Sequence, residues 1–274
     1  MSNILIINAD DLGLSKGVNQ AILRAHNEGY LTHASLMANA DYFDDAIANV
    51  IPNASKLKVG LHINLTCCKA LSGESSITDK NGFLANNFVK ILFLKKSKTN
   101  LKAIETEIEL QLQKLLDHNI QISHIDGHEH IHIIPSINKI VQKLAKKYHI
   151  ERIREINEDF STSFKYNSRT ASIANVVKLS LLKFLSLFNS NKKNVEFYSI
   201  LNTCEINSQN LFTYLESVKE KTVEVMLHPS LRDVDVKPPN LDARFIEFLR
   251  SDFRKQEFDL CFNEKFKKYA FFGN

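Results

Sequence analysis

The segment 123–132, SHIDGHEHIH, holds the densest set of side chains that could do chemistry. Four imidazoles are costly to bury without partners, whereas a divalent metal ion takes neutral imidazoles and carboxylates as ligands. In an extended chain, alternate side chains share one face but stand roughly 7 Å apart at their bases. One or two would therefore bind an ion, and the rest would support the ligands or bind substrate. The alternative is a histidine-rich surface loop. The alternating polar residues are His124, Asp126, His128, His130 and His132.

Two adjacent carboxylates, Asp10 and Asp11, follow the apolar run 3–8. Adjacent side chains at the end of a strand point in different directions. One carboxylate could therefore bind a metal ion while the other stays free as a base. The alternative is that the pair only shapes the turn before the next helix.

Two single histidines also belong to apolar runs. His62 lies within one run and His228 closes another. One such histidine is more often a hydrogen-bonded core residue than a ligand. The two count as evidence for a site because polar groups recur at the same end of several candidate strands. Arg152 and Arg154 fall in a further candidate strand, where one could hold a carboxylate or a substrate oxygen or form an ordinary ion pair.

Short apolar runs alternate with segments of helical periodicity along the whole chain. This alternation predicts an α/β fold of parallel strands joined by right-handed crossovers. Seven or eight mainly parallel strands favour a distorted (β/α) TIM-like barrel, in which catalytic residues stand at the carboxyl ends of the strands. The expected strands are 3–8, 32–38, 57–65, 120–126, 150–154, 197–201, 223–228 and 268–272. The expected helices are 16–28, 42–50, 101–117, 136–148, 208–220 and 241–252, with 67–98 irregular.

Composition predicts one cytoplasmic domain over 1–274. Hydrophobic residues make up 44% of the chain, which is enough for a large core. The net charge of +4 is too mild to indicate nucleic-acid binding. The four cysteines fit neither a zinc motif nor a disulfide framework, so we expect free thiols in a reducing compartment. The sequence shows neither a signal peptide nor a run of about 20 apolar residues.

The stretch 158–196 stands out by its charge and is interpreted as a variable insertion. No Asp or Glu occurs between Phe160 and Val195, where Lys and Arg contribute a formal charge of +6. Apolar residues within it recur at helical spacing and predict a basic amphipathic helix. This helix could pack as an ordinary barrel helix with solvated lysines. It could instead form a lid, or a peripheral contact with an anionic membrane in which Lys178 and Lys183 supply attraction.

Four motifs in order make the chain resemble the YdjC-like carbohydrate deacetylase family as far as about residue 232. The resemblance implies a distorted (β/α) barrel and a single divalent metal ion. It also implies hydrolysis of an N-acetyl amide on a sugar, as in chitooligosaccharide deacetylation. The stretch 155–200 matches no motif that we can place. The motifs are INADDLGLSKGVN at 7–19, GLHINLT at 60–66, SHIDGHEHIHIIPSI at 123–137 and VEVMLHPS at 223–230.

The resemblance also implies roles for individual residues. Asp11, His62 and His128 would bind the metal ion. Asp10 would be the catalytic base, and His228 the acid that protonates the leaving amine. The remaining polar residues would support the ligands or bind substrate: Asp126, His130, His132 and Arg154. Glu129 stands where many relatives have histidine, which changes either the ligand support or the substrate rim.

The implied mechanism is amide hydrolysis that releases acetate and an amino sugar from an oligosaccharide or a lipid-linked sugar. A Mg²⁺ or Zn²⁺ ion would bind water and the acetyl oxygen. Asp10 would take a proton from the water, and protonated His228 would give one to the nitrogen. Two alternatives are a metal-dependent phosphoesterase, which often uses two ions, and a non-catalytic, metal-stabilised carbohydrate-binding protein. The sequence leaves the sugar, the metal and a homodimer open.

Overall fold

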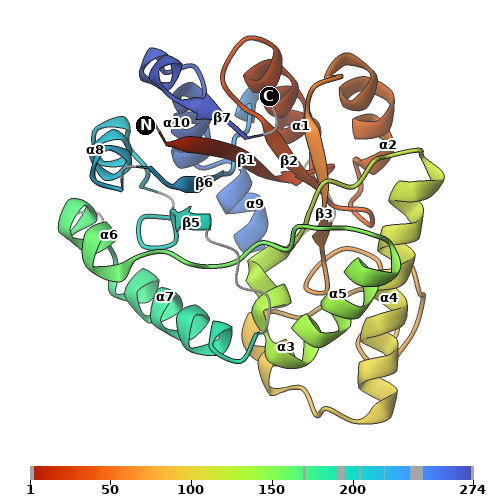
Figure 1. Cartoon of the computed structure of the whole chain (residues 1–274). Helices are drawn as coiled ribbons and strands as arrows, with labels where there is room; N and C mark the ends of the chain where they lie inside the picture. The colour runs from red at the N-terminus through yellow and green to blue at the C-terminus, as the bar shows by residue number, and fades with distance from the viewer. Residues whose placement is uncertain are drawn as a thin grey trace.

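Seven parallel strands form the centre of the fold (Figure 1). The computed structural model describes residues 3–168, 171–189, 195–203, 205–218, 220–234 and 243–272. The strands are β1 Ile4–Leu12, β2 His33–Leu36, β3 Lys58–Ile63, β4 Ile125–Gly127, β5 Val195–Tyr198, β6 Thr222–Leu227 and β7 Ala270–Phe271. They lie in the order β4-β3-β2-β1-β6-β5, and β7 pairs with β1. Every pairing between them is parallel, which confirms the predicted α/β class.

The seven parallel strands agree in part with the predicted distorted barrel, but their pairing does not form a continuous ring. β4 and β5 stand at the two ends of the sheet, and the extended segment 151–157 lies between them. Ile153 pairs with Ile125 of β4 in a single isolated bridge. On the other side, the backbone N–H of Phe197 in β5 donates to the carbonyl of Asn157 at 3.3 Å. One bridge and one hydrogen bond therefore replace the expected strand pairings.

The side chains of this connecting segment explain the difference. Arg152 and Arg154 are two residues apart, and both bind Glu224 of β6, each at 2.6 Å. A closed barrel fills its interior with layers of packed apolar side chains. Here the segment expected as strand 150–154 instead carries charged groups that bind a buried carboxylate across the sheet.

Helices surround the sheet (Figure 1). Helix α1 begins after Ser15, whose hydroxyl accepts a hydrogen bond from the backbone N–H of Val18 at 3.1 Å, as its sequence position predicts. The α-helices are α1 Lys16–Asn27, α2 Phe43–Asp45, α3 Phe88–Phe93, α4 Lys98–Asp117, α5 Pro135–Lys147, α6 Phe160–Asn167, α7 Ile173–Ser186, α8 Ser208–Ser217, α9 Ala243–Leu249 and α10 Asp252–Leu260. The other helical segments are η1 Ala46–Val50, η2 Ile51–Asn53, η3 His128–Ile133, η4 Arg232–Val234 and η5 Glu264–Lys268.

Three predicted segments differ from the structure. The stretch 42–50 is one turn of α2 followed by a π-helical segment rather than a regular helix. The stretch 67–98 was expected to be irregular, but it contains α3, whose six residues are too few to show helical periodicity. The expected helix 241–252 is two helices, because α9 ends at Leu249 and α10 begins at Asp252, after Ser251. Positions 241 and 242 lie outside the described residues.

A β-bulge interrupts β1 near its carboxyl end. The pairing of β1 with β2 shifts by one residue between Ala9 and Leu12, so Asp10 and Asp11 together stand opposite Ser35. Asp11 has a left-handed backbone with φ 69°. A regular strand sends successive side chains to opposite sides, and a bulge re-aims one of them.

The cysteines behave as packing residues. Cys67, Cys68 and Cys261 are free and buried, and Cys204 lies outside the described residues. The neighbouring Cys68 thiol and burial together raise the pKa of Cys67. A buried thiol with a raised pKa is a poor nucleophile, so Cys67 is not a candidate for catalysis.

Candidate active site

Both carboxylates of the bulge reach His62 on β3. The Oδ1 atom of Asp11 lies 3.5 Å from His62 Nε2. One oxygen of Asp10 lies within 4.8 Å of a His62 nitrogen. The bulge therefore brings together two adjacent side chains that a regular strand would separate.

Strand register fixes the orientation of His62. Its partner across the β3–β4 pair is Asp126, and His62 Nδ1 lies 2.7 Å from Asp126 Oδ1. This contact turns Nε2 toward Asp11. Burial would lower the pKa of His62, but Asp126, together with Asp11 and Asp10, raises it to about 10. A carboxylate on the far nitrogen is the usual support of a metal-binding histidine.

His128, at the start of η3, approaches the same oxygen from another side. Its Nε2 lies 3.9 Å from Asp11 Oδ1, and its Nδ1 lies 2.7 Å from the hydroxyl of Thr66. The rings of His128 and His62 meet edge to face with centroids 5.8 Å apart. Burial lowers the pKa of His128 to about 4. A metal ion needs both imidazoles neutral, so its binding would release the proton that the carboxylates favour on His62.

The prediction that the histidine-rich segment is extended, with alternate side chains on one face, is wrong. Glu129 and His130 have left-handed backbones, with φ 52° and 60°, and the chain turns through η3. His130 and His132 are buried with ring centroids 6.3 Å apart, and His130 also packs on Phe197. Of these three neighbouring histidines, His128 is the one whose ring stands at Asp11.

His124 is a core residue rather than a ligand. Its Nε2 lies 3.0 Å from the Ser35 hydroxyl, and its Nδ1 lies 2.8 Å from that of Ser123. The ring lies across Gly60, where an added Cβ would stand 2.4 Å from it. The glycine that precedes Leu61-His62 is therefore needed for packing, because any side chain there would displace His124.

Glu129 binds the N-terminus of a neighbouring helix. Its carboxylate accepts a hydrogen bond of 2.6 Å from the backbone N–H of Phe88 at the first turn of α3. A carboxylate at a helix N-terminus satisfies a free N–H group and interacts favourably with the helix dipole. Glu129 thus ties η3, which carries His128, to α3.

Arg154 is the centre of a buried charge network. Its guanidinium binds both oxygens of Asp10, at 2.6 and 2.7 Å. It also binds Asp126 at 2.7 Å and Glu224 at 2.6 Å. Burial would lower the pKa of Arg154, but the three carboxylates raise it. Burial alone would raise the pKa of Asp126. Arg154 and His62 instead hold this pKa well below its ordinary value.

Two overlapping sets of side chains could hold a metal ion. Asp10, His62 and Asp126 have ligand atoms within 4.8 Å of one another. Arg154 already binds both of those carboxylates, and its positive charge opposes a cation at this position. The second set is Asp11, His62 and His128, in which the Nε2 atom of each histidine lies near Asp11 Oδ1, at 3.5 and 3.9 Å.

Helix α10 supports two predicted site residues, and sequence reasoning missed it. Arg254 binds the second oxygen of Asp11 through Nη2, and its Nε donates to the carbonyl of His228 at 2.9 Å. Glu257 accepts from the backbone N–H of His228, and one of its oxygens lies 3.4 Å from His228 Nδ1. Burial would raise the pKa of Asp11, but Arg254 and His62 hold it well below its ordinary value. Ser251 before an Arg-x-x-Glu pair on one helical face was the available signal.

The family model described as YdjC-like protein matches residues 4–270 of this chain. The chain is 37% identical over 147 residues to a carbohydrate deacetylase of Brevibacillus brevis, covering 53% of this chain and 57% of that protein. It is 32% identical over 203 residues to a carbohydrate deacetylase of Clostridium beijerinckii, covering 73% of this chain and 80% of that protein. The match thus spans little more than half the length of the first relative and most of the second.

A solved structure shows the same fold. It comes from Enterococcus faecalis, and its description names cellobiose-phosphate cleavage. The two chains superpose with a TM-score of 0.68 at 20% sequence identity, over 98% of this chain and 94% of the other. At this identity the likeness concerns the fold alone.

Proposed function

Because the chain belongs to the YdjC-like family, we propose that it is a metal-dependent hydrolase that removes the acetyl group from an N-acetylated sugar. Relatives described as carbohydrate deacetylases support this class of reaction. The observation that carries the proposal is the convergence on Asp11 of two imidazoles, with a second carboxylate and a third histidine beside them. These residues are His62, His128, Asp10 and His228.

We assign the metal ion to Asp11, His62 and His128. One oxygen of Asp11 is held by Arg254, which leaves Oδ1 directed at the two imidazoles. Two nitrogen ligands and one oxygen suit Zn²⁺ better than Mg²⁺, which prefers oxygen ligands. When bound, such an ion supplies Lewis-acid activation of the acetyl oxygen and of water.

Asp10 and His228 provide the two proton transfers. Asp10 accepts a proton as water forms the new C–O bond, and Arg154 holds both of its oxygens in a fixed orientation. His228 donates a proton to the nitrogen as the C–N bond breaks, and Glu257 positions its ring. The side chain of His228 is 13% exposed against 3% for Asp10, which suits contact with an entering sugar. The products are acetate and an amino sugar.

Single-ion chemistry separates this proposal from a phosphoesterase, which often uses two ions. A second ion would have to use Asp10 and Asp126, where Arg154 already neutralises both carboxylates. A protein that only binds sugar would have no need of a carboxylate such as Asp10 beside the ligands. Release of acetate rather than phosphate from a panel of N-acetylated and phosphorylated saccharides would distinguish the three readings.

The metal assignment is tested by elemental analysis of two variants. His128→Ala should lose nearly all bound metal, because it removes a ligand. Asp126→Asn should retain an ion with affinity reduced by about 10–100-fold, because it removes only the support of His62. His118→Ala, which changes an exposed histidine at the end of α4, is the control. Full occupancy in a His62→Ala/His128→Ala double variant would show that the assignment is wrong.

The proton-transfer roles are tested by variants that keep the ligands. Asp10→Asn and His228→Gln should retain the metal and lower kcat by roughly 10²–10⁴-fold, because each removes one proton transfer. Acetate release from N-acetylchitooligosaccharides measures the effect. A variant with near-normal turnover would remove that residue from the mechanism.

A further inference from the structure

The most exposed apolar side chains lie together. Among the described residues, each large apolar side chain that is more than half exposed belongs to α3, to α7 or to the two residues that follow α7. Single exposed apolar residues are ordinary, whereas a concentrated group marks an interaction site. We call this group the α3–α7 surface. Its members are Val89, Phe93, Ile173, Val177, Phe184, Leu187 and Phe188.

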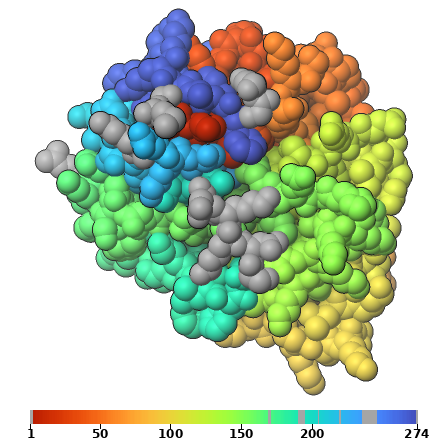
Figure 2. Space-filling view, in the orientation of Figure 1, coloured from red at the N-terminus to blue at the C-terminus, as the bar shows by residue number. Residues whose placement is uncertain are grey.

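The two helices belong to one part of the molecule, although 70 or more residues of chain separate their exposed residues. Phe88 and Leu92 of α3 pack against the same apolar cluster as Leu179 and Leu182 of α7. Both helices contact η3. Figure 1 shows α3 beside the end of α7, and Figure 2 shows α7 (teal) at the molecular surface.

The stretches of sequence that carry these two helices are basic. The stretches 80–104 and 160–195 contain no Asp or Glu, and each carries six Lys or Arg. The ammonium groups of Lys90 and Lys96 bind backbone carbonyls rather than carboxylates. That of Lys183 binds the carbonyl of Glu158 and lies close enough to the carboxyls of Glu158 and Asp159 to interact with them.

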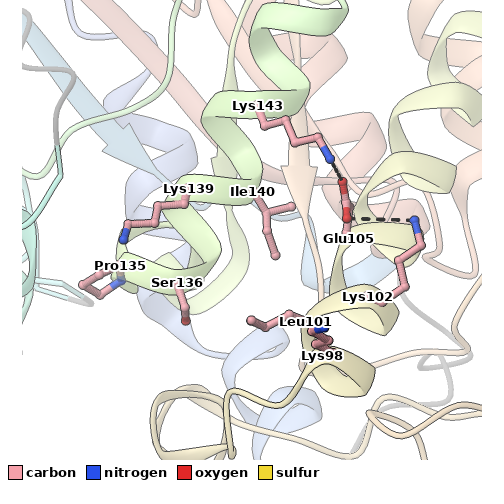
Figure 3. A pocket seen from close by; sticks show the side chains of 9 residues that line it. All are labelled: Lys98, Leu101, Lys102, Glu105, Pro135, Ser136, Lys139, Ile140 and Lys143. Atoms are coloured by element: carbon pink, nitrogen blue, oxygen red, sulfur yellow. Dashed lines mark hydrogen bonds and ion pairs between the residues drawn. The ribbon is translucent and has the colours of Figure 1, made fainter.

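A basic groove is lined by α4, and four residues connect α3 to this helix. This groove of about 580 Å³ lies between α4 and α5 (Figure 3). Its one carboxylate, Glu105, lies 2.5 Å from Lys143 and 3.9 Å from Lys102. The lining also includes Lys98 and Lys139. The groove therefore offers an anionic headgroup four lysines against one carboxylate.

We infer that the α3–α7 surface docks on an anionic lipid bilayer. Apolar side chains among lysines are the composition of interfacial helices, which insert the former and attract acidic headgroups with the latter. A second copy of this chain is a poor occupant, because it would bring lysines against lysines. No described helix is long and apolar enough to cross a membrane, so the contact is peripheral. Docking is independent of the proposed deacetylase reaction.

Co-sedimentation with vesicles tests the charge component. The protein should sediment with phosphatidylcholine vesicles containing phosphatidylglycerol, less with phosphatidylcholine alone, and less as salt rises. Lys90→Glu/Lys95→Glu should weaken partitioning at least roughly 30-fold. The matched control is Lys56→Glu/Lys58→Glu, which reverses two exposed lysines near the start of β3.

The apolar component is tested with Phe93→Ser/Phe184→Ser, which should weaken partitioning at least roughly tenfold. Leu110→Ser, which changes an exposed residue of α4, should have little effect. Acetate release from a soluble sugar should be unchanged in all of these variants. The inference is overturned if the protein stays in the supernatant with anionic vesicles at low salt, or if control and test variants lose binding equally. It is also overturned if light scattering finds a dimer that Phe93→Ser/Phe184→Ser dissociates.

Discussion

The strand-end site and the α3–α7 surface depart from ordinary protein architecture in opposite ways. The site buries charged groups, but Arg154 binds three carboxylates and Arg254 binds a fourth. The surface exposes apolar groups, and the ammonium groups of Lys90 and Lys96 bind backbone carbonyls rather than carboxylates. Buried charge persists only when partners are supplied within the fold. Exposed apolar groups need no partner for folding, so a partner of this surface comes from outside the molecule.

The largest expected effect comes from Arg154→Met, which removes the guanidinium that balances the buried carboxylates of the site. Asp10 and Asp126 would lose their buried guanidinium, and we expect the free energy of unfolding to fall by about 3–5 kcal/mol. Urea denaturation measures the change. Arg24→Met, which removes an exposed pair with Glu28 at 3.7 Å, is the control and should cost less than about 0.5 kcal/mol. Equal effects of the two substitutions would contradict the distinction between the regions.

A smaller effect is expected at the boundary of the two regions, where Glu158 lies. Its carbonyl accepts from Lys183 of α7 at 2.8 Å, and its carboxyl accepts from the backbone N–H of Ile200 at 2.6 Å. Burial raises the pKa of Glu158 from 4.5 to about 7. The pKa of Glu158 is therefore higher in the folded than in the unfolded protein. The stability that this carboxyl contributes below about pH 4.5 is lost as pH rises through about 7.

Glu158→Gln removes this titration. Between about pH 5 and pH 8, the wild type should lose about 2–3 kcal/mol more stability than the variant does. Chemical denaturation across this range measures the difference. Glu74→Gln, at an exposed carboxyl, should follow the wild type. Parallel pH profiles for wild type and Glu158→Gln would show that the carboxyl stays charged in the folded protein.

The smallest effect is expected on the α3–α7 surface itself. Phe93 is 79% exposed, so Phe93→Ser should change the free energy of unfolding by less than about 0.5 kcal/mol. Leu179 is buried on α7. Leu179→Ser should lower the free energy of unfolding by more than about 2 kcal/mol, because it removes apolar burial and adds a buried hydroxyl. A large loss of stability in Phe93→Ser would mean that this side chain serves packing rather than an external partner.

The sequence predicted the parallel strands and the strand-end cluster because both depend on local patterns. Apolar runs locate the strands, and Asp10, Asp11 and His62 come at or near the ends of such runs. The left-handed backbone at Glu129 follows from no such pattern, since strict alternation of polar residues fits a strand equally well.

Long-range contacts were beyond reach for a different reason. Arg254 meets Asp11 across most of the chain, and local periodicity carries no information about such pairs. The pairing of segment 151–157 with the sheet depends likewise on which carboxylate Arg152 and Arg154 bind. That carboxylate, Glu224, is far away in the sequence and close only in the folded protein. The metal set and the two proton-transfer roles remain predictions of the proposed function.

The bulge in β1 makes the number of residues in this strand as important as their identity. Deleting one residue between Ala9 and Leu12 would restore regular pairing with β2 and send neighbouring side chains to alternate sides again. The strand would become more ideal while the site lost one of its two carboxylates. Insertions and deletions are therefore forbidden here for a reason unrelated to folding, and a family-wide alignment should run through this bulge without a gap.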